Sequence, residues 1–329
     1  MDLYEPRRGR RDSNPVSSEQ ETIARLERRL GRTHARQRLG IESDHEARIL
    51  GRRLNLTQVE RWYSIHGAIR TALRLAGLHG RAVANAGRVM LRHNTVQSRR
   101  LPAAFDGYRV LHLSDLHADM SGPAMDRLVE MLPDIDYDLC VMTGDYRGKT
   151  FGPWEASLAG VEKVCRALKG PVYGVLGNHD TIRMVPALED MGLRLLLNEA
   201  VTIEREGSVL HLAGIDDAHF YRVHNIEKAA AGVSPGDYLI LLSHTPEVYR
   251  QAAHAGVDLM LSGHTHGGQI CLPGDVPITL DSDLPRSLGR GAWRHGGMQG
   301  YTSVGAGSSV VAVRLNCAPE ITLHTLQRA

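Results

Sequence analysis

The sequence has 329 residues, of which 42% are hydrophobic and only 5% aromatic, so one large or two modest domains with an aliphatic core are expected. The formal net charge of +2 is unevenly distributed: residues 1–100 carry 21 arginines, no lysine and 10 acidic residues (+11), whereas residues 101–329 carry 18 basic and 27 acidic residues (−9). Four cysteines without a C-x-x-C pair argue against a disulfide framework, and the lack of a long apolar run or a secretory leader favours a cytoplasmic protein without a transmembrane helix.

The N-terminal part of the chain has little apolar patterning. Residues 1–20 are polar and charged, with two prolines and several serines, and are expected to be disordered. Residues 21–65 contain short helical patterns to which the sequence assigns no function. The excess of arginine in residues 1–100 indicates an anionic partner, either a nucleic acid or a membrane surface, or else a solvated extension.

Residues 66–92 are predicted to form one amphipathic helix with an arginine ridge. On a helix the ridge residues fall within about 40° of one another. They are Arg70, Arg74, Arg81, Arg88 and Arg92. Such a ridge is typical of a helix on an anionic membrane surface, and the alternative is a helix packed on the main domain with a solvated face. Gly77, Gly80 and Gly87 weaken the prediction, since each costs roughly 1 kcal/mol relative to alanine in a helix.

After residue 101, short apolar runs alternate with helical patterns, which is typical of an α/β domain. The predicted buried strands are 108–113, 139–142, 172–176, 238–242 and 257–261. The predicted helices between them are 123–132, 154–168, 182–191 and 246–255. Hairpins are expected at 201–215 and from the late runs 310–315 and 320–326, whereas the glycine-rich stretch 289–300 is expected to be a flexible loop.

Five short polar motifs follow directly after apolar runs. They are Asp115-Leu116-His117, Gly144-Asp145, Gly177-Asn178-His179-Asp180, Ser243-His244 and Gly263-His264-Thr265-His266. In open α/β sheets, ligands bind outside the carboxyl ends of the strands, so the fold is expected to bring these side chains to one edge. The motifs therefore predict a single site.

The side-chain types in these motifs indicate metal chemistry. Carboxylate, imidazole and amide oxygen without thiolate suit Mn, Fe, Zn or Co. The candidate ligands are Asp115, His117, Asp145, Asn178, His244, His264 and His266. Seven ligands are too many for one ion that also holds water and substrate. The Asp145 carboxylate can bridge two ions, and two ions roughly 3.5–4 Å apart are suited to phosphoryl chemistry.

The ordered motifs D-x-H, G-D, G-N-H-D, a lone His and G-H-x-H resemble those of the calcineurin-like metallophosphoesterases. The resemblance covers residues 101–329 and implies a four-layer fold of two mixed sheets flanked by helices, with residues 1–100 as a basic helical extension. It implies that Asp115, His117 and His266 hold one metal. It likewise implies that Asn178, His244 and His264 hold the other and that Asp145 bridges both. His179 would protonate the leaving group, and Asp180 would orient His179.

The runs 261–273 and 314–322 resemble a bacterial branch of this family whose members are commonly membrane-associated, among them a UDP-2,3-diacylglucosamine pyrophosphatase. The resemblance implies hydrolysis of a lipid-linked or nucleotide-linked phosphate at the cytoplasmic membrane face. The alternatives are a nuclease or general phosphodiesterase, and an inactive scaffold. Nucleic acid is not the expected partner, because residues 1–100 offer few aromatic side chains for stacking. His219 is expected to line the pocket, and Arg147 and Lys149 to contact phosphate.

Overall fold

A computed structural model describes residues 15–53 and 67–329 of the chain. The α-helices in the described part include α1 (Pro15–Leu30), α2 (Arg32–Arg53), α4 (His79–Ala86), α5 (Gly122–Met131), α6 (Glu155–Ala167), α7 (Val185–Asp190), α8 (Ile226–Ala230) and α9 (Tyr249–His254). A further helix spans 67–75. The predicted disorder of residues 1–20 is wrong for 15–20, which lie in α1, and residues 1–14 lie outside the described part.

Two six-stranded mixed sheets form the centre of the fold. The first has the order β1-β14-β2-β3-β4-β5, and its strands are β1 (Met90–Ser98), β14 (Glu320–Arg328), β2 (Arg109–Leu113), β3 (Leu139–Met142), β4 (Val172–Gly174) and β5 (Leu193–Leu195). The second has the order β12-β13-β9-β8-β7-β6, and its strands are β12 (Gly291–His295), β13 (Met298–Thr302), β9 (Leu259–Ser262), β8 (Tyr238–Leu242), β7 (Ser208–Gly214) and β6 (Glu199–Arg205). A small ribbon joins β10 (Cys271–Leu272) to β11 (Val276–Pro277).

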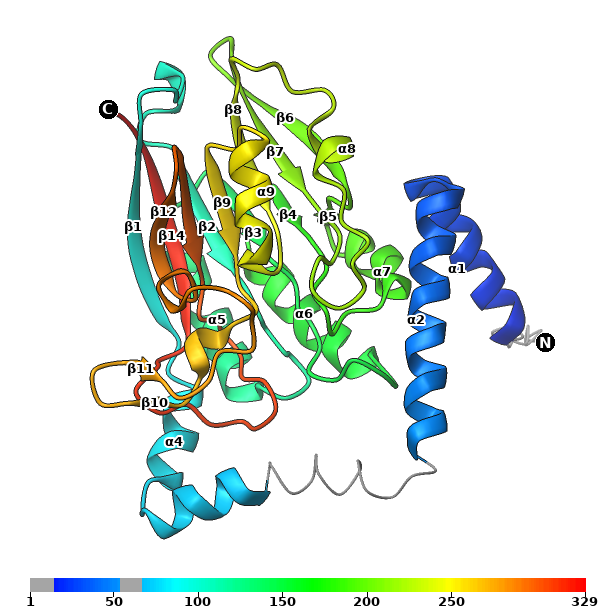
Figure 1. Cartoon of the computed structure of the whole chain (residues 1–329), viewed down its shortest axis with the longest axis vertical. Helices are drawn as coiled ribbons and strands as arrows, with labels where there is room; N and C mark the ends of the chain where they lie inside the picture. The colour runs from blue at the N-terminus through cyan, green and yellow to red at the C-terminus, as the bar shows by residue number, and fades with distance from the viewer. Residues whose placement is uncertain (1–14, 54–66) are drawn as a thin grey trace, which may run out of the picture.

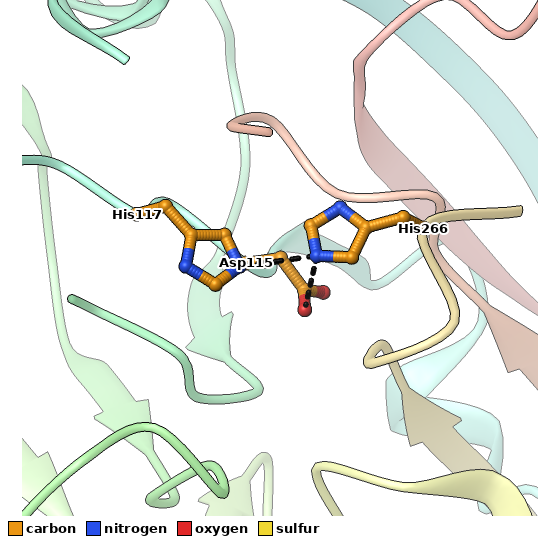
Figure 2. A group of neighbouring side chains, drawn as sticks. All are labelled: Asp115, His117 and His266. Carbon is orange, nitrogen blue, oxygen red and sulfur yellow. Dashed lines mark hydrogen bonds and ion pairs between the residues drawn. The ribbon is translucent and has the colours of Figure 1, made fainter. Parts of the chain in front are cut away.

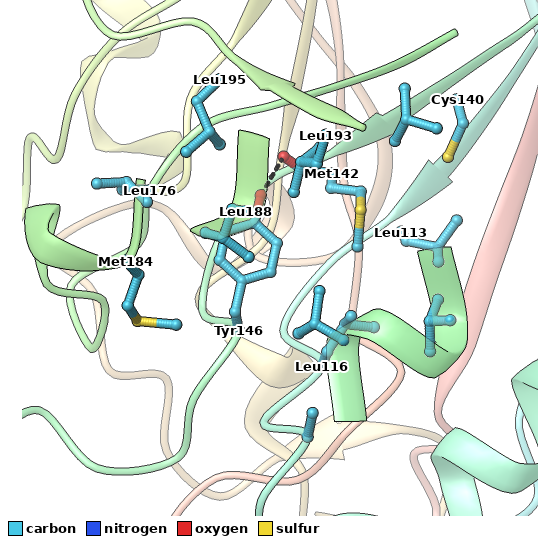
Figure 3. Packing of buried hydrophobic residues seen from close by; sticks show 14 of the residues in the cluster. Leu113, Leu116, Cys140, Met142, Tyr146, Leu176, Met184, Leu188, Leu193 and Leu195 are labelled. Carbon is cyan, nitrogen blue, oxygen red and sulfur yellow. Dashed lines mark hydrogen bonds between the residues drawn. The ribbon is translucent and has the colours of Figure 1, made fainter. Parts of the chain in front are cut away.

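Three hydrophobic layers hold the sheets and helices together, which confirms the predicted four-layer architecture (Figure 1). Val141 of β3 and Ile240 of β8 belong to the cluster between the two sheets. Leu113 and Met142 face the other way, toward α5, α6 and α7 (Figure 3). The ring of Tyr146 lies in this second layer, and its hydroxyl donates to a backbone carbonyl instead of remaining unpaired. Alternate residues of one strand therefore serve different layers.

The late part of the chain differs from the expectation. The glycine-rich stretch 289–300 contains the antiparallel strands β12 and β13 and is not a loop. Gly300 is required by packing, because a Cβ there would lie 2.2 Å from the Trp293 ring. The expected strand 310–315 is wrong as well: Leu315 makes only an isolated bridge with Ile270, and β14 pairs with β1 and β2.

The prediction of one continuous helix over 66–92 is wrong. The helix 67–75 ends in a turn where Gly77 takes a φ of +69°, a conformation that favours glycine, and α4 follows as a separate helix. Residues 90–98 are strand β1, which pairs in parallel with β14 over its full length. The five arginines therefore occupy two helices, a connecting loop and a strand, and form no single ridge. The sheet also begins before residue 101.

The helical patterns of 21–65 correspond in the described part to α1 and α2, which lie beside the first-sheet side of the domain (Figure 1). Arg29 of α1 pairs with Glu189 of α7 and Glu199 of β6 at 2.9 and 2.7 Å. Leu26 and Leu39 join the same core cluster as the first sheet. Within residues 15–53 and 67–329, no helix combines the length and apolar character needed to cross a bilayer.

Candidate metal centre

The five motifs converge at the carboxyl ends of strands from both sheets, as the sequence predicts. Asp115 and His117 follow β2, Asp145 follows β3, and Asn178 comes four residues after β4. The three remaining candidate ligands follow β8 and β9 and are His244, His264 and His266. Six of the seven side chains are buried and Asn178 is half-buried, so the cluster lies inside the domain.

One group of potential ligands consists of Asp115, His117 and His266 (Figure 2). The Nε2 atoms of His117 and His266 lie 3.0 Å apart, and His266 Nε2 lies 3.5 Å from Asp115 Oδ1. The other ring nitrogen of His117 contacts the carbonyl of Arg147 at 2.9 Å, which fixes the ring orientation. These three side chains therefore aim ligand atoms at one point.

A second group forms around Asn178. Its Oδ1 lies 2.9 Å from both His244 Nε2 and His264 Nδ1. Asp145 Oδ2 lies 3.3 Å from His244 Nε2 and 3.7 Å from His117 Nε2, so this carboxylate stands between the two groups. Asp115 is also close enough to join Asp145 and His244 in a three-ligand cluster. The two groups are therefore adjacent and share carboxylates.

The donor set fits two divalent transition-metal ions. Two imidazole Nε2 atoms converge, and His264 Nε2 is buried without a hydrogen-bond partner among the described residues. Burial raises the pKa of Asp115 to about 6, whereas at Asp145 the charges of His244 and His179 overcome burial and hold the pKa well below its usual value. Burial opposes the charged form of His244, but the neighbouring carboxylate of Asp145 raises its pKa to about 10. A cation at this position therefore competes with a proton.

The backbone at the site is strained. Five of the seven candidate ligands have positive φ, namely Asp115 (52°), His117 (40°), Asp145 (56°), His264 (72°) and His266 (50°). Such conformations cost about 1–3 kcal/mol each and persist only where the surroundings impose them. A Cβ at Gly177 would lie 2.1 Å from Asp145 Oδ1, and one at Gly263 would lie 2.3 Å from Asp115 Oδ2. These glycines thus give the carboxylates room.

His179 lies next to the cluster but in neither group of potential ligands. Its Nδ1 lies 3.0 Å from Thr150 Oγ1, and its Nε2 lies 4.0 Å from Asp145 Oδ2. The side chain is half-buried and lines the cavity described below. Sequence reasoning missed Thr150, because nothing in its local sequence distinguishes it and the contact spans 29 residues.

The expected role of Asp180 is wrong. Its carboxylate accepts hydrogen bonds from the backbone N–H groups of Asp145 (2.8 Å), Tyr146 (2.9 Å) and Gly177 (2.8 Å). The ring of His179 instead pairs with Thr150. Asp180 therefore holds the loop that carries Asp145, because a buried carboxylate is satisfied best by several N–H donors.

The expected phosphate contacts differ between the two basic residues. Arg147 is 2% exposed and donates to the backbone carbonyls of His179, Thr150 and Gly152, so it stabilises the loop that contains them. The prediction that Arg147 contacts phosphate is therefore wrong. Lys149 is exposed, and its role stays a prediction.

Two further residues near the centre have defined partners. The ring centroid of His219 lies 4.3 Å from that of His264, and its Nδ1 lies 3.0 Å from Glu247, a partner that the sequence did not indicate. Sequence reasoning also missed Arg314, which is fully buried and donates to the carbonyls of Val304, Gly305, Gly307 and His266.

A cavity of about 1010 Å³ opens beside the candidate ligands. Asp145, Asn178, His179, His264 and His266 form its polar wall. The remaining walls come from helix 67–75, α4 and the segments 268–281 and 309–316, and they are largely aliphatic. Representative lining side chains are Ile69, Leu73, Ile270, Leu280, Val311 and Leu315. The candidate metal centre therefore adjoins a large, mostly apolar cavity.

Comparison with known proteins agrees with this geometry. The calcineurin-like phosphoesterase family model matches residues 108–268. The uncharacterized metallophosphoesterase YkoQ of Bacillus subtilis is 32% identical over 66% of this chain and 83% of its own. A Bos taurus transmembrane protein with a metallophosphoesterase domain is 30% identical over 71% of this chain and 56% of its own. The phosphodiesterase YaeI of Escherichia coli is 27% identical over 67% of this chain and 82% of its own length.

Proposed function

Because the chain belongs to the calcineurin-like phosphoesterase family, whose activity is metal-dependent phosphoester hydrolysis, we propose that its substrate is lipid-linked. The bond cleaved is a phosphoester or pyrophosphate, as in UDP-2,3-diacylglucosamine, at the cytoplasmic face of a membrane. The observation that carries the proposal is the largely aliphatic cavity that shares a wall with the metal ligands.

In this proposal the two groups of ligands hold the two ions. Asp115, His117 and His266 hold one, and their converging nitrogens and carboxylate support that role. Asn178, His244 and His264 hold the other, and Asp145 between the groups serves both. The ions supply activation of a water molecule and neutralisation of charge on the phosphoryl oxygens.

His179 is the proposed general acid. Thr150 at its Nδ1 fixes the orientation of the ring and leaves Nε2 for a proton. That nitrogen lies 4.0 Å from Asp145, at the boundary between the ligands and the cavity. A substrate phosphate beside the ligands would therefore present its leaving oxygen to His179, and the proton would pass from Nε2 to that oxygen.

The cavity supports a substrate with hydrocarbon chains. Its volume lies at the upper end of the roughly 300–1,000 Å³ of small-molecule pockets, and most of its lining away from the ligands is apolar, although polar side chains such as Arg81, Thr279 and Asp281 also line it. Each methylene group buried there gains about 0.8 kcal/mol. The phosphate would lie at the metal centre and the chains along helix 67–75.

The surroundings of the cavity support a membrane as the source of that substrate. Leu272, Ile278 and Val310 line the cavity and are 54%, 54% and 37% exposed, and Leu75 on the adjoining helix is 85% exposed. Exposed apolar side chains of this size indicate a contact surface. Arg70, Arg74 and Arg81 are exposed on the adjoining helices, where they complement anionic lipid headgroups.

Filling the cavity should separate lipid from soluble substrates. Ala72 lines the cavity and is exposed, so Ala72→Trp adds an indole without removing core packing. We expect hydrolysis of UDP-2,3-diacylglucosamine to fall at least about tenfold, while hydrolysis of bis(p-nitrophenyl) phosphate stays within about twofold. The assay uses manganese-reconstituted protein and includes single-stranded DNA as a third substrate.

Ala84→Trp is the matched control, because Ala84 is exposed on α4 away from the cavity lining. Equal activity of Ala72→Trp on the lipid would contradict the lipid proposal. Preferred cleavage of DNA would favour the nuclease alternative, and no turnover of any substrate would favour the inactive scaffold.

Charge removal tests the membrane contact separately. Combined replacement of Arg70, Arg74 and Arg81 by Gln should release the protein from vesicles that contain phosphatidylglycerol, since each basic residue near such a surface contributes about 1 kcal/mol. The loss should match the effect of raised salt, because both weaken the same attraction. Vesicle co-sedimentation measures the bound fraction.

The matched control replaces the exposed Arg127, Arg166 and Arg194 with Gln, which removes the same charge from α5, α6 and β5. Equal release of both triple variants would show that only net charge matters. Unchanged binding of the first variant would exclude these arginines as the membrane contact.

A further inference from the structure

Helix α2 buries a polar face where a surface helix normally buries an apolar one. His34, Arg38 and Glu42 are spaced four residues apart, so they follow one side of the helix, and they are 9%, 0% and 5% exposed. Charged side chains are almost never this buried without partners. The partners of this face belong to the loops beside the metal centre.

The Arg38 guanidinium connects α2 to loops from both sheets. Nη1 donates to Asp216 Oδ1 at 2.9 Å, Nη2 to the carbonyl oxygen of Asp180 at 2.9 Å, and Nε to Glu42 Oε1 at 2.8 Å. Its flat face lies 3.5 Å from the ring centroid of Tyr221. All three nitrogens and the face of the group are therefore used.

Glu42 binds the two residues that follow Asp180, Thr181 and Ile182. It accepts hydrogen bonds from Thr181 Oγ1 at 2.6 Å and from the backbone N–H of Ile182 at 2.7 Å. With Arg38 on the carbonyl of Asp180, helix α2 holds residues 180–182 at three consecutive positions. This segment follows Asn178 and His179 directly.

Asp180 connects helix α2 to the candidate metal ligands through hydrogen bonds. Its carbonyl is held by Arg38, while its carboxylate accepts from the backbone N–H groups of Asp145 and Gly177, both at 2.8 Å. The backbone N–H of His179 in turn donates to Asp145 Oδ1 at 2.9 Å. A shift of Asp180 would therefore move the Asp145 carboxylate and the proposed acid His179 together.

Stability alone does not account for this charged face. Taking an ion pair out of water costs several kcal/mol per ion, and well-packed apolar residues often replace such pairs without loss of stability. The planar guanidinium group of arginine instead fixes the relative positions of its partners, because it donates hydrogen bonds to several acceptors in set directions. We therefore infer that the buried charges of Arg38 and Glu42 act mainly to fix the position of the 180–182 segment.

We propose that α2 is a positioning element of the metal centre, in which Arg38 and Glu42 hold the 180–182 segment so that Asn178 and His179 keep their places. The element lies outside the 108–268 region that the family model matches. The proposal concerns the phosphoester hydrolysis of the family and is independent of the lipid substrate.

The test uses the full chain and the double variant Arg38→Met/Asp216→Asn, which removes the buried Arg38–Asp216 ion pair and leaves the carbonyl of Asp180 unheld. Glu42 keeps Arg183 as a cationic partner at 3.3 Å. We expect a folded protein whose kcat on bis(p-nitrophenyl) phosphate at saturating Mn²⁺ falls about 10- to 100-fold, the range for a reacting group displaced by roughly 1 Å. The loss should grow as the leaving phenol becomes more basic, because a displaced His179 protonates it less well.

The matched control is Arg29→Met/Glu199→Gln. Arg29 also joins two carboxylates and a backbone carbonyl, but it anchors α1 to α7 and β6 away from the 178–182 segment. We expect lower thermal stability with kcat within about twofold of the unaltered protein. An equal loss of kcat in this control would overturn the proposal, because helix docking alone would then explain the effect.

Arg38→Lys covers the case in which the double variant does not fold. Lysine keeps the charge beside Asp216 and Glu42, but one ammonium group cannot reach all the acceptors of the fork. We expect a folded protein with kcat reduced about three- to tenfold. Unchanged kcat with either Arg38 variant, or a loss independent of the leaving phenol, would overturn the proposal.

Discussion

Asp145→Ala should lower kcat by more than about 10³-fold, because removal of one charge-stabilising donor from an active site already costs about 10²–10³-fold and this variant should weaken two metal positions. The reason is the position of this carboxylate between the two ligand groups, 3.3 Å from His244 Nε2 and 3.7 Å from His117 Nε2. Its removal should weaken both metal positions at once. Elemental analysis of the purified variant measures the metals, and steady-state hydrolysis of bis(p-nitrophenyl) phosphate measures kcat.

The control for this variant is Asp258→Ala, which removes a buried carboxylate paired with Arg100 at 3.1 Å and absent from both ligand groups. Asp258→Ala should lose stability but keep its metals. An Asp145→Ala protein that retained two ions per chain would refute the bridging role.

His179→Ala should leave both metals in place and lower kcat by about 10²–10⁴-fold, the usual range for loss of a general acid. His179 lies beside Asp145 but belongs to neither ligand group, so its loss removes a proton donor and no ligand. Elemental analysis tests whether the metals are retained. Measurements of kcat on substrates with leaving phenols of different basicity test whether a proton donor is lost.

His211→Ala provides the comparison, because His211 of β7 is buried and pairs with Asp237 at 3.0 Å, away from the ligand groups. It should keep kcat. Loss of metal from His179→Ala would assign His179 to the ligands and remove it as the acid.

The convergence of the candidate metal ligands was predictable because its signals are local. Each motif follows a strand within a few residues, and the parallel strands of each sheet place their carboxyl ends at one edge, so the order of apolar runs and polar motifs predicts which side chains gather within each sheet. The same local patterns located strands β3 and β8 at their observed bounds.

The remaining features depend on contacts between distant segments. Helical periodicity suggested one helix over 66–92, but pairing with β14, more than 200 residues away, makes 90–98 a strand. Thr150, Glu247 and Arg38 acquire their roles from partners 28 to 178 residues away, and no local pattern indicates them. The glycines of 289–300 suggested a loop, although Gly300 makes room for Trp293 within a hairpin.

The central claim is that the seven converging side chains hold two metal ions that are required for hydrolysis. Elemental analysis of the active, unchelated protein, combined with activity before and after chelation, tests it most directly. We predict about two transition-metal ions per chain, with metal and activity lost together on chelation and restored together by Mn²⁺. Full activity in protein that contains no bound metal would contradict the claim.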